Sequence, residues 1–340
     1  MKKQQSSPHE NFPHHHFFEL SSHQRAKKAI DFALKMRPSH YHILLMGDKK
    51  TGRIYSTLSY LQEYVKKQPA PHDWIYLKNF HRENAPLPFA LPAGKGIMFE
   101  ADLRDFIHNV KTVVGRVGRS TAYIKTVEDI ATQVQFNIDM DFKNLSDLAQ
   151  EKGFKLVQTQ DDITIEPMED FDQFSENDLK PLRQILAKIS QNANIATQRA
   201  NKKIHALKRK TIKESIYPLW KDFRKHYVKY MGHWLDHLLH DMIEHIDLFL
   251  DVPDASGSDP EDIIKERYAV NLFVDNRNQK HPVVHLQDTS NFESLFGSIE
   301  YTNHPHHGLT TNFTMMKAGS LHKANGGYLI IRADDILKNY

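Results

Sequence analysis

The sequence predicts an α/β protein in which a parallel sheet of the P-loop type is interrupted by a long helical hairpin. An apolar run at residues 41–47 ends in glycine and leads through a short loop into a helix-like segment. Near the other end, Gly326 and Gly327 precede the apolar run 328–331, a pattern typical of a strand entering a buried parallel sheet. Between these blocks, residues 182–207 show the apolar spacing of paired helices.

Composition is that of a water-soluble globular protein and narrows the function classes only slightly. Hydrophobic residues make up 40% of the 340 residues, charged residues 26%, and the net charge is +3, too small to indicate a nucleic-acid partner by itself. The chain has no cysteine, which excludes disulfides, thiolate catalysis and cysteine-ligated zinc. The N-terminal residues lack the apolar core of a secretory signal, and no apolar run approaches a membrane span. We therefore expect a cytoplasmic protein without a membrane partner.

The first half of the chain alternates strand-like and helix-like segments. Apolar residues recur at helical spacing in 23–36, and the strand 41–47 is followed by a second helix at 56–68. Residues 73–80 are predicted to form a strand and the proline-rich segment 83–96 a loop. An amphipathic helix is expected over 98–114, and alternation around Asp161 and Asp162 predicts a small hairpin within 152–168.

The middle of the chain predicts a helical hairpin that folds back on itself. Small and apolar residues alternate spacings of four and three in the first arm, and bulky aromatic residues populate a returning arm after a break at Pro218. Residues 252–262 have the composition of a linker, and 267–276 predict a strand that returns to the sheet. The first arm contains Leu182, Leu186, Ile189, Ala193, Ala196, Ala200, Lys203 and Leu207, and the second contains Trp220, Phe223, Tyr227, Met231, Trp234, Leu238, Met242 and Phe249.

These patterns predict a domain order along the chain. A disordered tail spans residues 1–18, and the first half of an α/β domain spans 19–110. A helix with a small hairpin follows at 111–168, a helical hairpin at 169–252, and the second half of the α/β domain at 263–340.

The loop after the first strand matches a phosphate-binding loop, G-x-x-x-x-G-K-[ST], in its two glycines only. Arg53 stands where the lysine is expected, and its guanidinium is bulkier and planar. Ile54 stands where the hydroxyl that binds Mg²⁺ is expected, and it has no oxygen. The basic side chains could still hold an anion at the helix N-terminus, while the alternative is a strand-to-helix turn that binds no nucleotide. The loop reads Gly47, Asp48, Lys49, Lys50, Thr51, Gly52, Arg53 and Ile54.

Several blocks, in order, resemble one protein family. They are HQRAKKAIDFAL, HILLMGDKKTGR, PHDWIYLKNF with PLPFALPAGKG, EKGFKLVQTQDDITIEPM, RYAVNLFVDN, PVVHLQDTSNFESLFGSIEY and TNFTMMKAGSLHKANGGYLIIRADDIL. Over about residues 20–340 the chain is similar to the Lon-related AAA+ proteases, which join an AAA+ domain with a long helical insertion to a Ser-Lys peptidase domain. The resemblance implies ATP-dependent proteolysis of substrate proteins by a homo-oligomeric ring, a hexamer in the family. It also implies an AAA+ fold and ATP with Mg²⁺ as cofactors.

The family's functional residues carry over only in part. Gly47 and Gly52 match the phosphate-loop glycines, whereas Arg53 and Ile54 depart from the pattern. After the strand that follows Gly326 and Gly327, Arg332 stands where the metal-binding aspartate of the family is expected. Ala333 stands where the catalytic glutamate is expected. A shift of two residues could recruit an aspartate, but it would move a buried strand. The residues at this Walker B-like position are Arg332, Ala333, Asp334 and Asp335.

These departures predict severely weakened ATP hydrolysis, because both groups stabilise charge in the transition state. No catalytic residue is assigned to this chain. The resemblance implies that the sensor strand, the arginine finger and the Ser-Lys dyad would lie beyond Tyr340, so we interpret the sequence as a fragment or a truncated gene. A pore-facing loop is expected near residues 313–316. The competing hypothesis is a pseudo-ATPase that serves as a protein-binding or assembly module.

Two weaker patterns carry alternative functions. His233, His237, Asp241 and Glu244 fall on one helical face, and a histidine pair four residues apart can bind zinc. The chain has 22 histidines, however, so we prefer a solvated helix face and predict no metal site. Basic and aromatic residues also mix at 204–213 and 226–234, which could form a nucleic-acid face. Their aromatic residues lie on the helical seam, so we prefer core packing and expect no nucleic acid.

Overall fold

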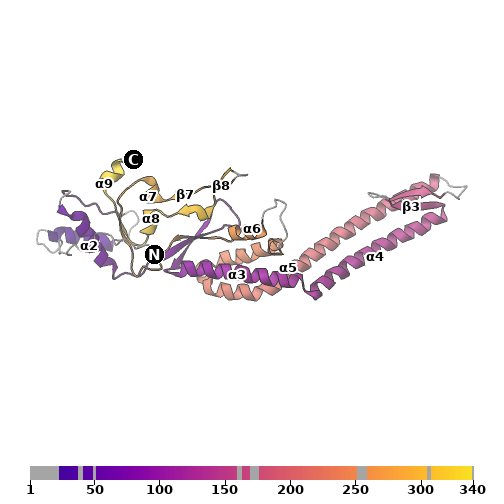
Figure 1. Ribbon diagram of the computed structural model, residues 1–340, viewed down its shortest axis with the longest axis horizontal. Helices are drawn as coiled ribbons and strands as arrows, with labels where there is room; N and C mark the ends of the chain where they lie inside the picture. The colour runs from indigo at the N-terminus through magenta and orange to yellow at the C-terminus, as the bar shows by residue number, and fades with distance from the viewer. Residues whose placement is uncertain are drawn as a thin grey trace. The chain divides into compact units, whose positions relative to one another are not determined.

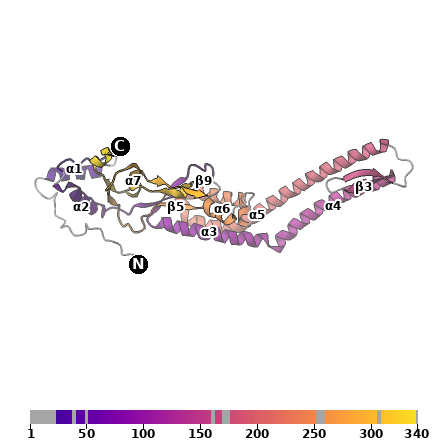
Figure 2. The same cartoon turned by 45° about the horizontal axis from the view of Figure 1, so that its top comes forward.

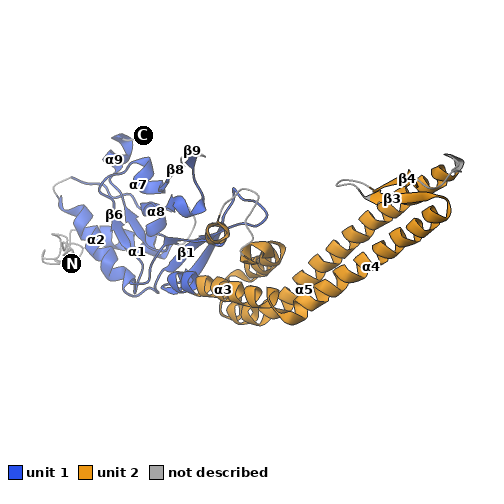
Figure 3. Cartoon of the chain, turned by 45° about the vertical axis from the view of Figure 1, so that its right-hand side comes forward, with its two compact units in different colours: residues 1–101, 267–340 blue, residues 102–266 orange. Residues whose placement is uncertain are grey.

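A computed structural model describes residues 23–36, 41–48, 51–158, 163–168, 176–250, 259–304 and 308–338. Two compact units divide the chain, as the colours of Figure 3 show: unit 1 comprises residues 1–101 and 267–340, and unit 2 comprises residues 102–266. Unit 2 is therefore one continuous insertion between the two halves of unit 1.

Unit 1 carries short helices and small sheets (Figure 1). Its described helices are α1 (Gln24–Lys35), α2 (Arg53–Val65), α7 (Phe292–Phe296), α8 (Ser320–Lys323) and α9 (Ala333–Lys338), with a 3₁₀ turn η5 at Phe313–Met315. Its described strands are β1 (His72–Leu77), β2 (Leu87–Pro92), β5 (Val270–Val274), β6 (Val284–Leu286), β7 (Ser298–Ile299), β8 (Thr302–His304), β9 (Gly308–Thr310), β10 (Met316–Lys317) and β11 (Tyr328–Ile330).

The largest sheet of unit 1 has three antiparallel strands in the order β2–β1–β5. Ile75 and Leu77 of β1 are completely buried, as alternation along a strand with one covered face requires. The prediction of a strand near residues 73–80 is confirmed. The prediction of a loop over 83–96 is wrong, because β2 lies inside it and pairs with all of β1. The three prolines in this segment led to the prediction of a loop. They are compatible with β2 because it is an edge strand, where residues without an N–H are tolerated.

Asp73 fastens this sheet to the start of helix α3 (Lys95–Gly118). Its carboxylate is fully buried, and it accepts hydrogen bonds from Gly96 N (2.8 Å) and Asn276 N (2.7 Å). A methyl group at Gly96 would lie 3.1 Å from the Asp73 carboxylate oxygen and 2.6 Å from Leu272 Cδ1. Gly96 is therefore required for close approach. One carboxylate joins β1, the first turn of α3 and the chain that leaves β5.

A parallel pair, β6 with β11, is the part of unit 1 closest to the predicted P-loop sheet. Buried Ile30, Leu34 and Leu61 pack against it from α1 and α2. The predicted buried strand at 41–47 is not formed: residues 41–46 have no strand assignment, and Leu44 and Met46 are 76% and 85% exposed. The described sheets are small and mostly antiparallel, so the expected multi-stranded parallel sheet is not observed.

Glycines permit the tight crossings around β7, β10 and β11. A Cβ on Gly297 (φ +87°) would lie 2.0 Å from Lys317 O, and one on Gly319 would lie 2.3 Å from Leu295 O. Gly326 has φ +80°, and a Cβ on Gly327 would lie 2.1 Å from Val283 O. The Gly-Gly pair therefore serves two needs, since one glycine takes a left-handed turn and the next lets β11 approach the backbone before β6.

Unit 2 is almost entirely helical. Besides the larger part of α3, it contains α4 (Thr121–Glu151), β3 (Phe154–Gln158), β4 (Ile163–Pro167), α5 (Glu176–Glu244), η4 (Ile246–Leu250) and α6 (Pro260–Arg267). Figures 1 and 2 both show α4 running beside the first part of α5 to the β3–β4 hairpin. The predicted hairpin within 152–168 is confirmed, although Asp161 and Asp162 lie outside the described residues.

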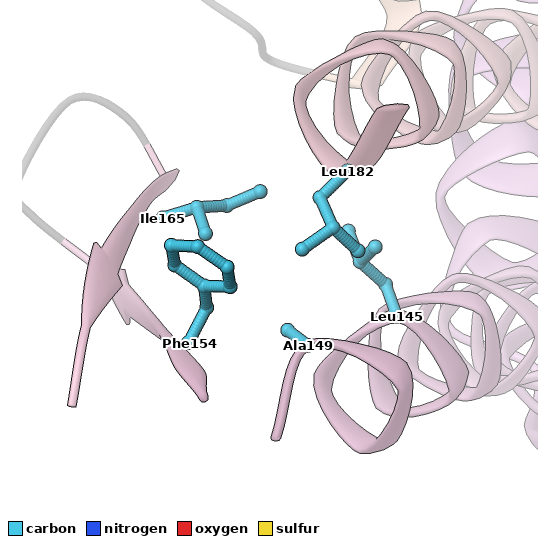
Figure 4. Close-up of a cluster of buried hydrophobic side chains, with 5 residues drawn as sticks. All are labelled: Leu145, Ala149, Phe154, Ile165 and Leu182. Atoms are coloured by element: carbon cyan, nitrogen blue, oxygen red, sulfur yellow. The ribbon is translucent and has the colours of Figure 1, made fainter. Parts of the chain in front are cut away.

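A small core holds the hairpin onto the helix ends. Phe154 and Ile165 of the strands face Leu145, Ala149 and Leu182 of the two helices (Figure 4). This cluster defines the arm tip, residues 142–189 around the hairpin. Leu186 and Ile189 pack at its edge, as their place in the predicted seam requires.

The predicted hairpin, in which the arm at 182–207 packs on the arm at 220–249, is not observed. The seam that begins at Leu182 packs against α4, and Ile204, not Lys203, continues its covered face. Pro218 does not break the helix. The backbone leaves helical geometry at Met231 (φ −146°, ψ 39°), and the chain folds back there.

Contacts across this fold-back place the aromatic residues in one bundle. Trp220 Nε1 donates to Leu235 O at 3.0 Å, and Arg224 holds Asp236 at 2.9 and 3.2 Å. Phe106 of α3 stacks on Phe223 with ring centroids 4.8 Å apart. Core packing of the aromatic residues is therefore confirmed for Trp220, Phe223, Tyr227, Trp234 and Phe249, each at most 8% exposed.

Candidate nucleotide site

The predicted phosphate loop lies at the N-terminus of α2, and α2 packs on the parallel pair. Tyr64, near the end of α2, contacts Tyr328 at the start of β11, with ring centroids 6.3 Å apart. The C-terminal part of α2 therefore lies beside the start of β11. Ligands of open α/β sheets bind at the edge formed by the carboxyl ends of the strands, which here is the far end of the β6–β11 pair.

The described part of the loop is held by its own hydrogen bonds. Gly47 (φ +144°) and Gly52 (φ +69°) both take backbone conformations that favour glycine. Thr51 donates from its N–H and its hydroxyl to Asp48 O, at 3.3 and 2.8 Å. Ser56 donates to Gly52 O in the same manner, at 3.0 Å from each group. Lys49 and Lys50 lie outside the described residues.

Arg53 turns back toward the loop. Its Nη1 is shielded from solvent and has no hydrogen-bond partner among the described atoms. The same nitrogen lies 3.8 Å from the position a Cβ would take on Gly47. A lysine in this position reaches outward to phosphates, whereas this guanidinium occupies space beside the loop backbone.

The first turn of α2 offers backbone donors but no metal ligand at the expected place. Gly52 is the N-cap, and no side chain caps the turn. Ile54 is half-buried and supplies no oxygen. The aliphatic hydroxyls that follow, on Ser56 and Thr57, donate to Gly52 O at 3.0 Å and to Arg53 O at 2.7 Å, and Thr57 is only 6% exposed. The turn can attract an anion through its N–H groups, but it cannot coordinate Mg²⁺ through residue 54.

The Walker B-like segment presents a cation to solvent. Arg332 follows β11 and is exposed, and its carbonyl accepts from Asp335 N at 3.1 Å as α9 begins. Ala333 and Asp334 are also exposed, while Asp335 is half-buried in the first turn. The structure thus places the two aspartates on a helix after the strand and leaves Arg332 at the strand end.

A buried polar network behind this edge could not be recognised in the sequence. Gln287 N donates to Ile330 O at 2.9 Å, which extends the parallel pair by one hydrogen bond. The Gln287 side chain donates to Thr289 O at 2.5 Å and accepts from the Ser320 hydroxyl. Gln287 and Ser320 are 7% and 6% exposed. The network holds the backbone after β6 against α8. In the sequence, Gln287 is only a polar residue at the end of a strand, and nothing there indicates that Ser320 is its partner.

Asn271 is a second residue that the sequence did not reveal. Its Nδ2 donates to Phe313 O at 2.6 Å and to Met316 O at 3.1 Å, from β5, an outer strand of the β2–β1–β5 sheet. Residues 313–316, the expected pore-facing loop, are half-buried and form η5 and the start of β10. The sheet therefore holds this segment directly.

The histidine pattern does not converge on a ligand set. His233 and His237 are exposed, whereas Asp241 is 7% exposed. Across the described ranges, no group of three or more histidine, aspartate or glutamate side chains could hold a metal ion.

In the same part of the chain, no helix is long and apolar enough to cross a membrane.

Comparisons with protein families match two separate parts of the chain, which lie mostly in unit 1. Residues 279–340, from before β6 through α9, match the LonB-like AAA domain. Residues 73–106, which contain β1, β2 and the first half of α3, match the Lon-like LonC helical domain. A search of curated proteins found no significant match. The two matches name related families, and they support a Lon-related protease family for this chain.

Proposed function

We propose that this chain is the ATPase-like, non-hydrolysing part of a Lon-related protease, which handles substrate proteins without nucleotide turnover. The observation that carries the proposal is the exposed Arg332 at the strand end where the family's metal-binding acid is expected. Arg53, turned back beside the loop, and Ile54, without an oxygen, add to it. The peptidase chemistry of the family is assigned to no residue of this chain.

Electrostatics makes a bound Mg-nucleotide unfavourable at this edge. A divalent cation needs oxygen ligands, usually carboxylates or hydroxyls beside the substrate phosphates. Here residue 54 offers a hydrocarbon and residue 332 a positive charge. A nucleotide held only by the α2 N–H groups would not gain the charge stabilisation that a metal supplies in the transition state.

Titration with a fluorescent ATP analogue, with and without Mg²⁺, tests the proposal. We expect Mg²⁺ to leave the affinity unchanged and phosphate release to stay at background. The variant Arg53→Lys/Ile54→Thr/Arg332→Asp restores the family's ligand types and is expected to make binding Mg²⁺-dependent. Arg332→Ala, which removes the cation without supplying a ligand, is the control. Mg²⁺-dependent hydrolysis by the unaltered chain would contradict the proposal.

Assembly into a homo-oligomeric ring is part of the same proposal. An exposed aromatic pair supports it: the rings of Phe292 and Phe296 stack 4.8 Å apart on α7 while 75% and 51% exposed. Ile299 and Tyr301 nearby in the chain are also more than half exposed. Exposed apolar groups of this kind often mark protein contacts. The second candidate function, a protein-binding or assembly module, is favoured by this exposed surface. Sedimentation velocity would measure whether the chain assembles into oligomers.

A further inference from the structure

Unit 2 contains a cavity of about 1350 Å³ that the family resemblance does not explain. Its walls come from the second half of α3, the start of α4, the middle of α5, η4 and α6. It is larger than the roughly 300–1,000 Å³ of most small-molecule pockets. All of its lining residues belong to unit 2, so the cavity is complete within one unit.

The lining is strongly basic. Six arginine and lysine side chains line the cavity, against the single carboxylate of Glu261. The lysines are already engaged with acids: Lys208 pairs with Asp247, while Lys111 and Lys265 lie 3.9 and 3.1 Å from Glu261. The arginines are the cations left to attract a ligand from outside.

Three arginines, Arg104, Arg116 and Arg119, are exposed and have no acidic partner in the described part of the chain. Arg104 and Arg116 stand on α3, separated by about 18 Å at the helical rise of about 1.5 Å per residue. A guanidinium forms paired hydrogen bonds to carboxylates and phosphates alike. Charge therefore predicts an anionic ligand, and the spacing predicts a long one.

The floor of the cavity is apolar. Ile212, Phe249 and Ile264 are 2%, 1% and 5% exposed, and their neighbours Ile107 and Leu250 are half-buried at the cavity surface. Gly115 leaves space between the basic positions of α3, because a Cβ there would meet only Arg119 Nη2, at 3.7 Å. Burial of apolar surface contributes favourable free energy only when an apolar group covers that surface. A purely ionic ligand would leave the apolar floor exposed to water.

Nucleic acid fits these walls less well than a peptide does. Single-stranded nucleic acids stack their bases on exposed aromatic rings. Besides the imidazole of His108, the described lining offers the rings of Tyr123 and Phe249, and Phe249 is buried. An extended peptide rises about 3.3 Å per residue, so five or six residues span the distance between Arg104 and Arg116.

We propose that this cavity binds an extended acidic segment of another polypeptide. Its carboxylates pair with Arg104, Arg116 and Arg119, and its alternate apolar side chains cover the floor beside Gly115. The proposal deepens the protein-handling role and rests on it. Its test requires no nucleotide, so the two proposals fail separately.

Fluorescence anisotropy with a labelled octapeptide of alternating glutamate and leucine tests the site on the full chain. The triple variant Arg104→Gln/Arg116→Gln/Arg119→Gln should weaken binding at least about tenfold, because it removes up to three charge-assisted hydrogen bonds. The matched control Arg183→Gln/Lys188→Gln/Arg199→Gln removes the same charge from exposed positions on α5 and should change affinity less than about twofold. All six substituted side chains are exposed, so both variants are expected to keep the wild-type circular dichroism and melting midpoint.

A second comparison separates the apolar contribution from charge. Gly115→Trp fills the cavity without altering charge and should also weaken peptide binding, whereas Gly115→Ala should not. A peptide of alternating glutamate and glycine should bind more weakly than the leucine peptide. Absence of leucine-peptide binding, an equal loss in the α5 control, or tighter arginine-dependent binding of oligo-dT or polyphosphate would each overturn the proposal.

Discussion

At the scale of single residues, buried polar groups connect parts of the chain that are far apart in sequence. Asp73 joins Gly96 and Asn276, Gln287 joins Ser320, and Asn271 holds the carbonyls of Phe313 and Met316. A buried polar atom without its partner is destabilising, so each of these residues requires the fold around it.

We predict that Asp73→Asn destabilises unit 1 by about 1–3 kcal/mol. The amide keeps one acceptor oxygen, so one of the two N–H groups that Asp73 binds would face a second donor. Urea denaturation followed by far-UV circular dichroism and tryptophan fluorescence measures the change. Asp105→Asn, at an exposed carboxylate of α3, is the control and should shift stability by less than about 0.5 kcal/mol. Equal effects of the two variants would contradict the assigned role of Asp73.

Tyr60 carries a prediction about alkaline stability. Burial, together with the hydrogen bond to Asp31, raises the pKa of Tyr60 from 10.0 to about 12. The folded state therefore holds this proton between pH 10 and 12, where the unfolded state has lost it. The contribution of Tyr60 to stability is complete below pH 10 and is lost as the pH rises through about 12.

Comparison with Tyr60→Phe measures this contribution. The difference in urea midpoint between the wild type and the variant should be largest below pH 10 and should shrink toward pH 12. Tyr41→Phe, at a ring that is 45% exposed, is the matched control. A wild-type advantage that grows above pH 10 would show that the Asp31 contact has been misassigned.

At the scale of elements, local pattern predicted a helix over 98–114, helical arms within 182–249 and the arm-tip hairpin, but neither α6 nor the pairing of α5. The spacing of Leu182, Leu186 and Ile189 marks a covered face, yet any apolar helix nearby could cover it. Pro218 suggested the turn, whereas the chain turns at Met231, beside Gly232. Long-range contacts determine the position of the turn, because Trp220 donates a hydrogen bond to Leu235 O and Phe223 stacks on Phe106.

The arm tip offers a test at this scale. Phe154→Ala should destabilise the tip by about 3–5 kcal/mol, because it empties the centre of the five-residue cluster. Hydrogen exchange in residues 142–189 should accelerate, while the bundle around Phe106 and Trp220 keeps its protection. Phe136→Ala removes a ring that is 59% exposed on α4, the helix that precedes β3, and serves as the control. Uniform acceleration throughout unit 2 would contradict a separate tip.

At the scale of the whole molecule, unit 2 is a continuous insertion with its own core. Leu103, Val110, Ile216, Leu235 and Leu238 are each at most 1% exposed inside it. A domain with such a core can fold alone.

We predict that residues 95–266, which keep α3 whole, fold as an isolated fragment. The fragment should be strongly helical and melt cooperatively in circular dichroism, because its buried contacts are internal. Its Tyr227 should also resist ionisation, since burial and the hydrogen bond to Asp102 raise the pKa of Tyr227 in this unit. Leu235→Asp, which places a charge in the core, is the destabilising control. A non-cooperative melt of the unaltered fragment would contradict the prediction.

The sequence by itself indicated a Lon-related family, through the blocks around Gly326 and Gly327, and it determined which functional groups the candidate nucleotide site can offer. Arg53, Ile54 and Arg332 lack the functional groups that Mg-nucleotide chemistry needs, whatever the surrounding fold. Only the tertiary structure decided which strands pair, where α5 turns and which cations surround the cavity of unit 2. These features depend on contacts between residues that are far apart in sequence. Local periodicity indicates that one face of a helix or strand is buried, but it does not indicate which element packs on that face.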